Sequence, residues 1–451
     1  MHTHHFENNR LQCDYWGGVW NPVDGRIYLP PRNATRAVRF DPATKKWEAF
    51  GDTFAKTEFL TNDKWNSPAL SSIDNCMYAV PMLGGVANRV LKIDPANGTA
   101  REVGADLREL IGEVINGNWA YFGTIEGGDG DLYGIPCNAT CVLRFDPRTN
   151  EAGVFGHLEN PVQGNYYGGV LGPSGRYIFA IPAMASRVLC IDTEKLTVEL
   201  IGDDFDCGLA DVDNFMQHSK WATGALAPDD CIYAIPLTGS IPYILRIDPA
   251  AKTASIFGPC LYGTANGWYE GPYGWIGATR GLDGCLYLTP HGETHILRID
   301  VFTGTVSTLD KAFPPSLRMK LAQGVTDRDG AIWFLPLNPP CRMFRIAPGR
   351  SRTELLTTLS QSQHRALLLE GLRDYRCYGP ALMVELWRES VRPGGDSALV
   401  SELLEAAATV IPAVITASFK TDDDGLTALM LLKTIVAVLP LQVDAPRTLW
   451  C

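Results

Sequence analysis

Few side chains in this sequence have the types and spacing that catalysis or metal binding requires. His291 and His295 stand four residues apart in the segment HGETH, but two imidazoles need further ligands to hold a metal ion, and the sequence identifies none. Cys137 and Cys141 flank the tripeptide NAT without the second cysteine pair that a zinc site would use. We therefore expect structural roles for these residues, and we expect neither a metal nor another cofactor.

Carboxylates and a histidine could still be recruited to a catalytic site from separate loops. Glu126, Asp213, Glu270 and His218 are available for such a role, but nothing in their spacing indicates that they converge. The sequence also contains no glycine-rich phosphate loop and no nucleophile elbow. We therefore favour a binding protein over an enzyme.

Aromatic side chains form a more regular pattern. Each stands 12 to 14 residues before a second recurring aromatic, and several have the polar neighbours Lys64, Asn118, Asn165 and Lys220. The set comprises Trp16, Trp65, Trp119, Tyr166, Trp221 and Trp275, with Lys320 in the seventh place. Such rings are typical of ligand sites and also of cores between packed sheets. Their role depends on the elements that position them.

Those elements come from a repeat. One phrase, an apolar residue, an aromatic, two further residues and a proline, recurs seven times with its aromatics 50, 55, 46, 54, 54 and 46 residues apart. The aromatics are Tyr28, Tyr78, Tyr133, Phe179, Tyr233, Tyr287 and Trp333. A period near 50 residues is typical of propeller blades.

Each repeat predicts four short antiparallel strands. A Gly-rich strand precedes a turn that often contains Asp-Gly, which favours a hairpin. The second strand carries the aromatic and ends at its proline, because proline cannot donate to a strand ladder. The third ends at an aspartate that can cap the next turn. Two residues earlier stands a cation in six repeats, with Cys190 the exception: Arg39, Lys92, Arg144, Arg246, Arg298 and Arg345. We expect each to pair with the aspartate of its own or a neighbouring blade, except that Ala347 leaves Arg345 without that carboxylate.

Two repeats resemble known families. The segment RIYLPPRNATRAVRFDPATKKWEAF resembles a kelch unit, and GVTDRDGAIWFLPLNPPCRMFRIAPG is similar to units of the streptogramin-lyase type of propeller. Proline replaces the paired glycines of kelch, and only the first repeat has the closing tryptophan, Trp47. The resemblance implies an all-β, seven-bladed β-propeller of four-stranded antiparallel blades over residues 16–357, and no particular substrate.

The innermost strand of a propeller blade faces the central channel. The recurring aromatics should therefore surround one mouth of that channel, either as an aromatic cup for a ligand or as core between blades. The connections 202–220 and 258–273 are long, and long loops on a rigid scaffold often carry recognition. In the second of them we expect Trp268, Tyr269 and Glu270 to contact a ligand or partner.

The chain ends differ from the repeats. Residues 1–15 are expected to form a tail, and the Leu/Ala-rich spacing of 358–451 predicts a small α-helical C-terminal extension. Its last apolar segment is short for a membrane span. Ring closure is expected from packing of repeat seven against repeat one, or from the first fourteen residues, and both remain open.

Composition limits the partners. The net charge of −11 and the absence of a Lys/Arg-rich run argue against nucleic acid. No signal peptide is evident, so we expect a cytoplasmic protein. Three of the twelve cysteines share one repeat position, where we expect buried thiols: Cys76, Cys231 and Cys285.

The sequence leaves three hypotheses about function. The first is a non-catalytic propeller that presents an aromatic-rimmed face to a protein partner or a small ligand. The second is a metal-dependent propeller lyase or hydrolase with its site at the channel mouth. The third is a structural subunit of a large assembly that docks through its C-terminal helices.

Overall fold

The computed structural model describes most of the repeat region. The described residues are 13–57, 63–83, 86–112, 114–115, 119–159, 161–205, 218–238, 240–261, 274–281, 283–291, 293, 295–301, 303–312, 321–337 and 343–346. The predicted helical region, 358–451, lies outside them. So do Asn118, Trp268, Tyr269, Glu270 and Lys320.

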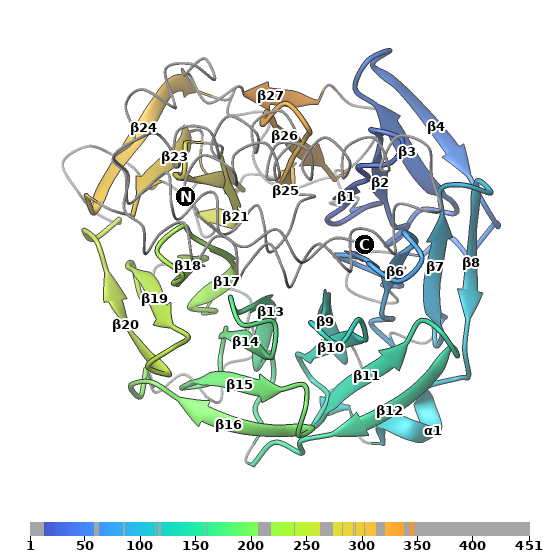
Figure 1. The fold of residues 1–451 in the computed structure, drawn as a ribbon, viewed down its shortest axis with the longest axis horizontal. Helices are drawn as coiled ribbons and strands as arrows, with labels where there is room; N and C mark the ends of the chain where they lie inside the picture. Colours follow the sequence, from blue (N-terminus) through green and yellow to red (C-terminus); the bar gives the residue numbers. More distant parts are fainter. Residues whose placement is uncertain are drawn as a thin grey trace, which may run out of the picture. The chain divides into compact units, whose positions relative to one another are not determined.

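Seven antiparallel sheets follow one another around a ring, as predicted (Figure 1). The first three blades are β1 (Val19–Trp20), β2 (Ile27–Leu29), β3 (Ala37–Asp41) and β4 (Lys46–Phe50); β5 (Ala69–Leu70), β6 (Met77–Ala79), β7 (Val90–Asp94) and β8 (Thr99–Val103); and β9 (Tyr121–Glu126), β10 (Leu132–Pro136), β11 (Val142–Asp146) and β12 (Glu151–Phe155). A short helix, α1 (Arg108–Ile111), precedes β9.

The next four blades continue the pattern. They are β13 (Tyr166–Leu171), β14 (Tyr177–Pro182), β15 (Val188–Asp192) and β16 (Thr197–Ile201); β17 (Trp221–Leu226), β18 (Ile232–Pro236), β19 (Ile244–Asp248) and β20 (Thr253–Phe257); β21 (Trp275–Arg280), β22 (Leu286–Pro290), β23 (His295–Asp300) and β24 (Thr305–Ala312); and β25 (Leu321–Thr326), β26 (Ile332–Pro336) and β27 (Phe344–Ile346). Blade seven has three strands within the described residues.

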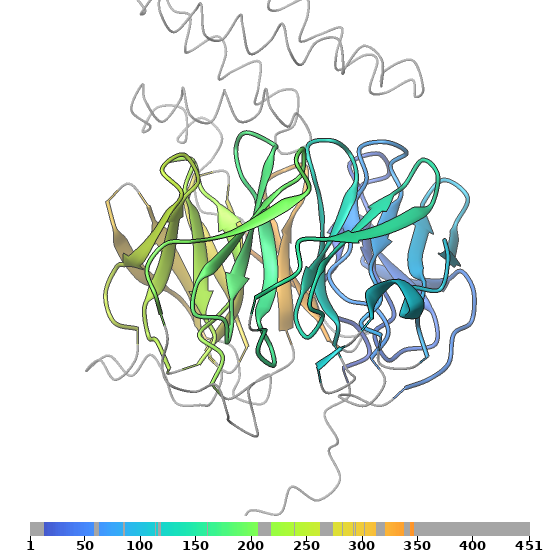
Figure 2. The same ribbon diagram turned by 90° about the horizontal axis from the view of Figure 1, so that it is seen from below.

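In every blade the strands pair in sequence order. From blade two through blade seven and on to blade one, the first strands of neighbouring blades contact one another. Figure 2 shows the sheets standing side by side with their turns at the two faces. Because the pairing is antiparallel, the hairpins between strands one and two lie on one face. The connections between strands two and three, and those between blades, lie on the other.

The recurring tyrosine of strand two stabilises the hairpin before it. Its hydroxyl donates to the aspartate four residues earlier, at 2.7 Å from Tyr78 to Asp74 and 2.8 Å from Tyr233 to Asp229. Tyr28 and Tyr133 make the same bond to their own turns. The aspartate also caps the turn, because its carboxylate accepts a backbone N–H two residues on. These bonds explain why the aromatic at this position is a tyrosine in these four blades.

The cations of strand three form ion pairs, but mostly not with the aspartate two residues later. Lys92 lies 2.8 Å from Asp74 of the hairpin turn, and Arg144 lies 2.5 Å from Asp131. The strand-three aspartates instead accept backbone N–H groups of the turns that follow. Arg345 stacks on Trp333, with 5.6 Å between the guanidinium carbon and the ring centroid.

Consecutive blades bury their facing sides in separate hydrophobic clusters. One further cluster joins blade seven to blade one through Trp333, Leu335, Phe40 and Tyr15. The backbone N–H of Tyr15 donates to the carbonyl of Leu337 at 2.9 Å. Packing of blade seven on blade one thus closes the ring, and residues 13–15, expected to be tail, belong to the propeller.

The described residues contain no helix long and apolar enough to cross a membrane. Cys76, Cys231 and Cys285 are buried as expected. Burial raises the pKa of the Cys76 and Cys231 thiols to about 12, so both stay protonated at neutral pH.

Candidate functional site

Two positions of the repeat bring side chains to the axis of the ring. One directly follows the strand-two proline, and it holds Arg32, Met82, Cys137, Ala183, Leu237, His291 and Leu337. The other is the second residue of the first strand or its equivalent: Trp16, Asn66, Phe122, Tyr167, Ala222, Ile276 and Ala322. The apolar members form one buried cluster with Cys13 and Trp119, which we call the axial cluster. Because all seven blades contribute, this cluster must lie at the axis.

The structure corrects the alignment of the predicted aromatics. The residue that pairs with the strand-two proline is Trp65, Tyr166, Trp221 or Trp275 in four blades, as expected. In the other three blades it is Tyr15, Tyr121 and Leu321. Trp16 and Trp119 are therefore not equivalent to the other four aromatics.

Four of the six predicted aromatics lie between blades. Trp65, Tyr166, Trp221 and Trp275 are each at most 2% exposed and belong to the inter-blade clusters. The indole N–H groups donate to backbone carbonyls, at 2.8 Å from Trp221 to Tyr243 and 2.9 Å from Trp65 to Arg89. These four aromatics therefore belong to the core between blades, which was one of the two expected roles. A ring buried between two blades cannot line the rim of an open cup.

Trp16 and Trp119 instead enclose a buried ion pair. The Arg32 guanidinium carbon lies 4.8 Å from the Trp16 ring centroid and 5.0 Å from that of Trp119. Arg32 donates to Asp63 at 2.9 Å, and the Trp119 indole N–H donates to the same carboxylate oxygen at 2.7 Å. Both side chains of the ion pair are at most 1% exposed. Burial opposes the charge on Arg32, but the carboxylate of Asp63 offsets it and the pKa of Arg32 is raised.

His291 completes the polar part of the axis. Its ring packs edge-on against Trp16 with the centroids 5.7 Å apart, and its Nδ1–H donates to the Leu321 carbonyl at 2.9 Å. Burial lowers the pKa of His291 to about 4, so the imidazole is neutral at pH 7. The axis is thus filled by packed side chains, with the Arg32–Asp63 ion pair among them. Two polar atoms there, Asn66 Nδ2 and Asp63 Oδ1, are buried without a hydrogen bond within the described residues.

Three predicted polar residues occupy one further repeat position, directly before the residue that pairs with the strand-two proline. Lys64 Nζ donates to the Ala55 carbonyl at 2.8 Å, and Lys220 Nζ donates to the Met184 carbonyl at 3.1 Å. Asn165 Nδ2 donates to the Cys137 carbonyl at 3.0 Å. All three are buried, and each fixes a connection of its own or a neighbouring blade.

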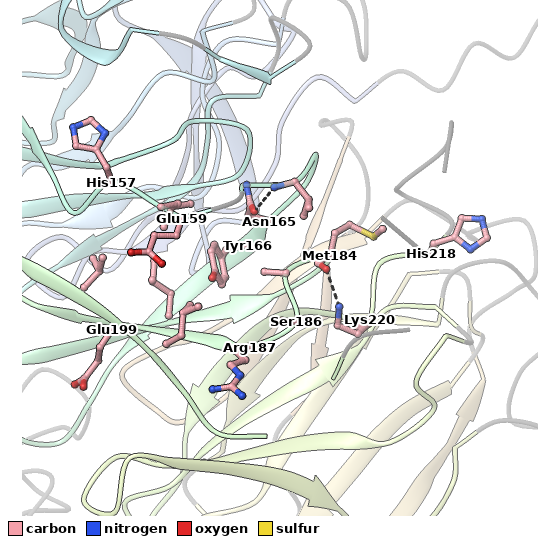
Figure 3. Close-up of a pocket in the computed structure, with 16 residues that line it drawn as sticks. His157, Glu159, Asn165, Tyr166, Met184, Ser186, Arg187, Glu199, His218 and Lys220 are labelled. Carbon is pink, nitrogen blue, oxygen red and sulfur yellow. Dashed lines mark hydrogen bonds between the residues drawn. The ribbon is translucent and has the colours of Figure 1, made fainter. Parts of the chain in front are cut away.

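Asn165, Tyr166 and Lys220 meet at a cavity beside blade four, which we call the flank pocket (Figure 3). Its volume is about 500 Å³. Its walls come from the β12–β13 connection (157–159 and 162), the β14–β15 connection (184–187), strand β16 and the segment that enters β17 (218 and 220). The pocket therefore lies on the face that carries the connections between blades.

The flank pocket combines apolar walls with charged groups. Leu158, Val162, Tyr166, Leu189 and Val198 supply apolar surface, and the charged or titratable lining residues are His157, Glu159, Arg187, Glu199, His218 and Lys220. A cavity of this size with a few polar groups is typical of small-molecule sites. The sequence named only four lining residues, Asn165, Tyr166, His218 and Lys220, because the other walls come from segments without a repeat signature.

Comparison with known proteins supports the fold alone. No family model and no curated protein sequence match the chain. Among solved structures, virginiamycin B lyase from Staphylococcus aureus is 14% identical with a TM-score of 0.51, covering 72% of this chain and 92% of the lyase. A catalytically inactive variant of that lyase with quinupristin is 15% identical, with a TM-score of 0.50 and coverage of 73% and 93%.

Hydrazine synthase from Kuenenia stuttgartiensis is 12% identical with a TM-score of 0.51, covering 78% of this chain and 99% of that one. At such identities the likeness extends to the propeller architecture and carries no activity over. The resemblance to streptogramin-lyase propellers is confirmed at the level of the fold.

Proposed function

We propose that this chain is a non-catalytic propeller that binds a small ligand in the flank pocket. The observation that carries the proposal is the cavity of about 500 Å³ beside blade four, which is lined by both charged and apolar side chains. Three residues that the sequence singled out for binding, Asn165, Tyr166 and Lys220, line it. The ligand is small because a cavity of this volume matches drug-sized molecules.

The axis is a poorer candidate for the ligand site. Its apolar residues from all seven blades are packed in the axial cluster, and Arg32, Asp63 and Trp119 already bind one another there. A ligand could enter only if this packing were displaced, which would cost stability. The flank pocket needs no such rearrangement.

The pocket chemistry favours binding over catalysis. A nucleophile or general base is normally held by a hydrogen bond to its partner. Within the described part of the chain, neither His157 nor His218 forms a hydrogen bond or an ion pair. The hydrogen bonds drawn in Figure 3 join Val162 to Asn165 and Lys220 to the Met184 carbonyl, and neither involves a histidine.

A ligand-observed NMR screen of a chemically mixed fragment set tests the proposal. The wild type is compared with Ser186→Trp, which places a large ring in the flank pocket at a lining position. Thr197→Trp is the matched control, because Thr197 is an exposed residue of the same blade outside the pocket. We expect fragments that bind the wild type and the control but not Ser186→Trp. If every binding fragment also binds a folded Ser186→Trp, the flank pocket is not the site.

A further inference from the structure

The charges of the flank pocket do not balance. Arg187 and Lys220 are the formally charged cations, and Glu159 and Glu199 are the carboxylates. Glu199, however, already forms an ion pair with Lys252, which is not a lining residue. Among the described lining residues, Glu159 is therefore the carboxylate left to balance Arg187 and Lys220. A positive pocket is notable on a chain whose net charge is −11.

Of these two cations, Arg187 has fewer polar partners. Within the described part of the chain it forms no hydrogen bond, ion pair or stacking contact. Other arginines of the same face of the repeat behave differently: Arg32 is paired with Asp63. Lys220 is held at the pocket wall by its bond to Met184. Figure 3 shows Arg187 and Lys220 projecting from different wall segments, and Glu159 from a third.

An unpaired guanidinium presents a planar fork of N–H donors. That fork matches the two oxygens of a carboxylate, and the resulting bonds are stronger than neutral ones because both partners are charged. The local excess of about one positive charge suits a singly charged group. A doubly charged phosphate would keep one negative charge without a compensating cation there.

The apolar walls define the other end of the ligand. Leu158, Val162 and Tyr166 line the pocket together with Leu189 and Val198. Apolar walls of this kind hold the body of a ligand, while a few polar groups fix its orientation. The lining thus suits a molecule with one charged end and one apolar end.

We propose that the flank pocket binds a small monocarboxylate with an apolar body, its carboxylate paired with Arg187 and its body against the apolar wall. This inference rests on the proposed ligand-binding function. It adds the chemical class of the ligand and the residue that selects it.

Isothermal titration of the full chain with three matched probes tests the ligand class. Hydrocinnamate, hydrocinnamamide and phenylpropylamine share one apolar body and differ in the charge of the head group. We expect hydrocinnamate to bind about tenfold more tightly than the neutral amide, because a hydrogen bond to a charged group contributes more than a neutral one. The amine should bind most weakly.

Variants then assign the selection to one residue. Arg187→Gln should weaken hydrocinnamate binding about tenfold and leave binding of the amide unchanged. The matched control is Lys195→Gln, which removes one positive charge from an exposed turn of the same blade, outside the pocket. It should leave both affinities unchanged, which separates a local contact from the effect of net charge.

The outcomes distinguish the two proposals. Equal binding of carboxylate and amide, or an equal loss of both in Arg187→Gln, would overturn the carboxylate assignment while the pocket remained a binding site. No measurable binding of any probe at millimolar concentration would also overturn it. The binding function itself fails only if no fragment in the NMR screen depends on Ser186.

Discussion

The axis of the propeller and the flank pocket use related positions of the same repeat, but one is filled and the other is hollow. Lys64 and Lys220 both directly precede the residue that pairs with the strand-two proline, and both ammonium groups donate to a backbone carbonyl. Lys64 leads into blade two beside the Arg32–Asp63 pair, whereas Lys220 is part of the pocket wall. The repeat position therefore sets where a side chain lies, and its neighbours decide what it faces.

Arg32 at the axis and Arg187 in the flank pocket differ in the same way, because only Arg32 is paired with a carboxylate. Arg32 is enclosed by Trp16, Trp119 and Asp63, so its charge is paired within the fold. Arg187 has no such partner in the described part of the chain. A paired buried cation serves the integrity of the ring, whereas an unpaired cation in a cavity is suited to a ligand.

The largest effect should come from breaking the axial ion pair. Asp63→Ala leaves the Arg32 guanidinium buried without its carboxylate, and we expect the free energy of unfolding to fall by about 3 to 5 kcal/mol. Urea denaturation measures the loss. Arg187→Ala should change the free energy of unfolding by less than about 0.5 kcal/mol, because it removes no internal pair.

A second variant checks that the loss comes from the unpaired charge. Replacing both partners, Arg32→Met with Asp63→Leu, should recover much of the lost stability, since no buried charge remains. A loss in Asp63→Ala no larger than that in Arg187→Ala would mean that the axis and the flank do not differ in this way.

The axis and the flank pocket should also differ in how their histidines, His291 and His157, affect the pH dependence of stability. The folded pKa of His291 is lowered to about 4, from 6.5 in an unperturbed histidine. Between these values the unfolded chain binds a proton that the folded chain does not. The free energy of unfolding should therefore fall by roughly 2 to 3 kcal/mol as the pH decreases from about 6.5 to about 4.

Urea denaturation across this pH range, with two variants, assigns the effect. His291→Phe should remove most of this slope, because the axial histidine no longer titrates on unfolding. His157→Gln, which removes a histidine from the flank pocket, should retain it. An unchanged slope in His291→Phe would contradict the burial of this imidazole at the axis.

The smallest expected change in stability comes from replacing a glycine by alanine, and its sign should differ between an inner and an outer strand. Gly168 lies in inner strand β13 at φ +73°, and an added Cβ would meet Thr223 of the next blade at 3.3 Å. Gly168→Ala should destabilise the chain by about 1 kcal/mol. Gly153 in outer strand β12 has no atom within 4 Å of an added Cβ, so Gly153→Ala should stabilise by about 0.5 kcal/mol. Thermal unfolding of both variants measures the difference, and equal shifts would contradict it.

The repeat made the fold predictable, because the aromatic and the proline of each unit mark one strand and its end. The same regularity also misled, since Trp16 and Trp119 stand at nearly the expected spacing but one or two residues from the position that pairs with proline. The residues after the prolines, Arg32 and His291 among them, could have been aligned from the sequence as an axial set.

The flank pocket could not have been predicted in this way. Its walls come from connections and from an outer strand that carry no repeat signature. The free guanidinium of Arg187 is visible only when its neighbours are placed in space, because an arginine in the sequence gives no sign of whether a carboxylate lies beside it. Sequence reasoning named four wall residues, Asn165, Tyr166, His218 and Lys220, and assigned them to the central channel and its mouth.

The crystal structure of the full chain with hydrocinnamate tests the central claim most directly. We expect density for the ligand in the flank pocket, with its carboxylate at the Arg187 guanidinium and its ring against the wall formed by Leu158 and Tyr166. The axial cluster around Arg32 should be unchanged. Ligand density at the axis, between Trp16 and Trp119, would contradict the account.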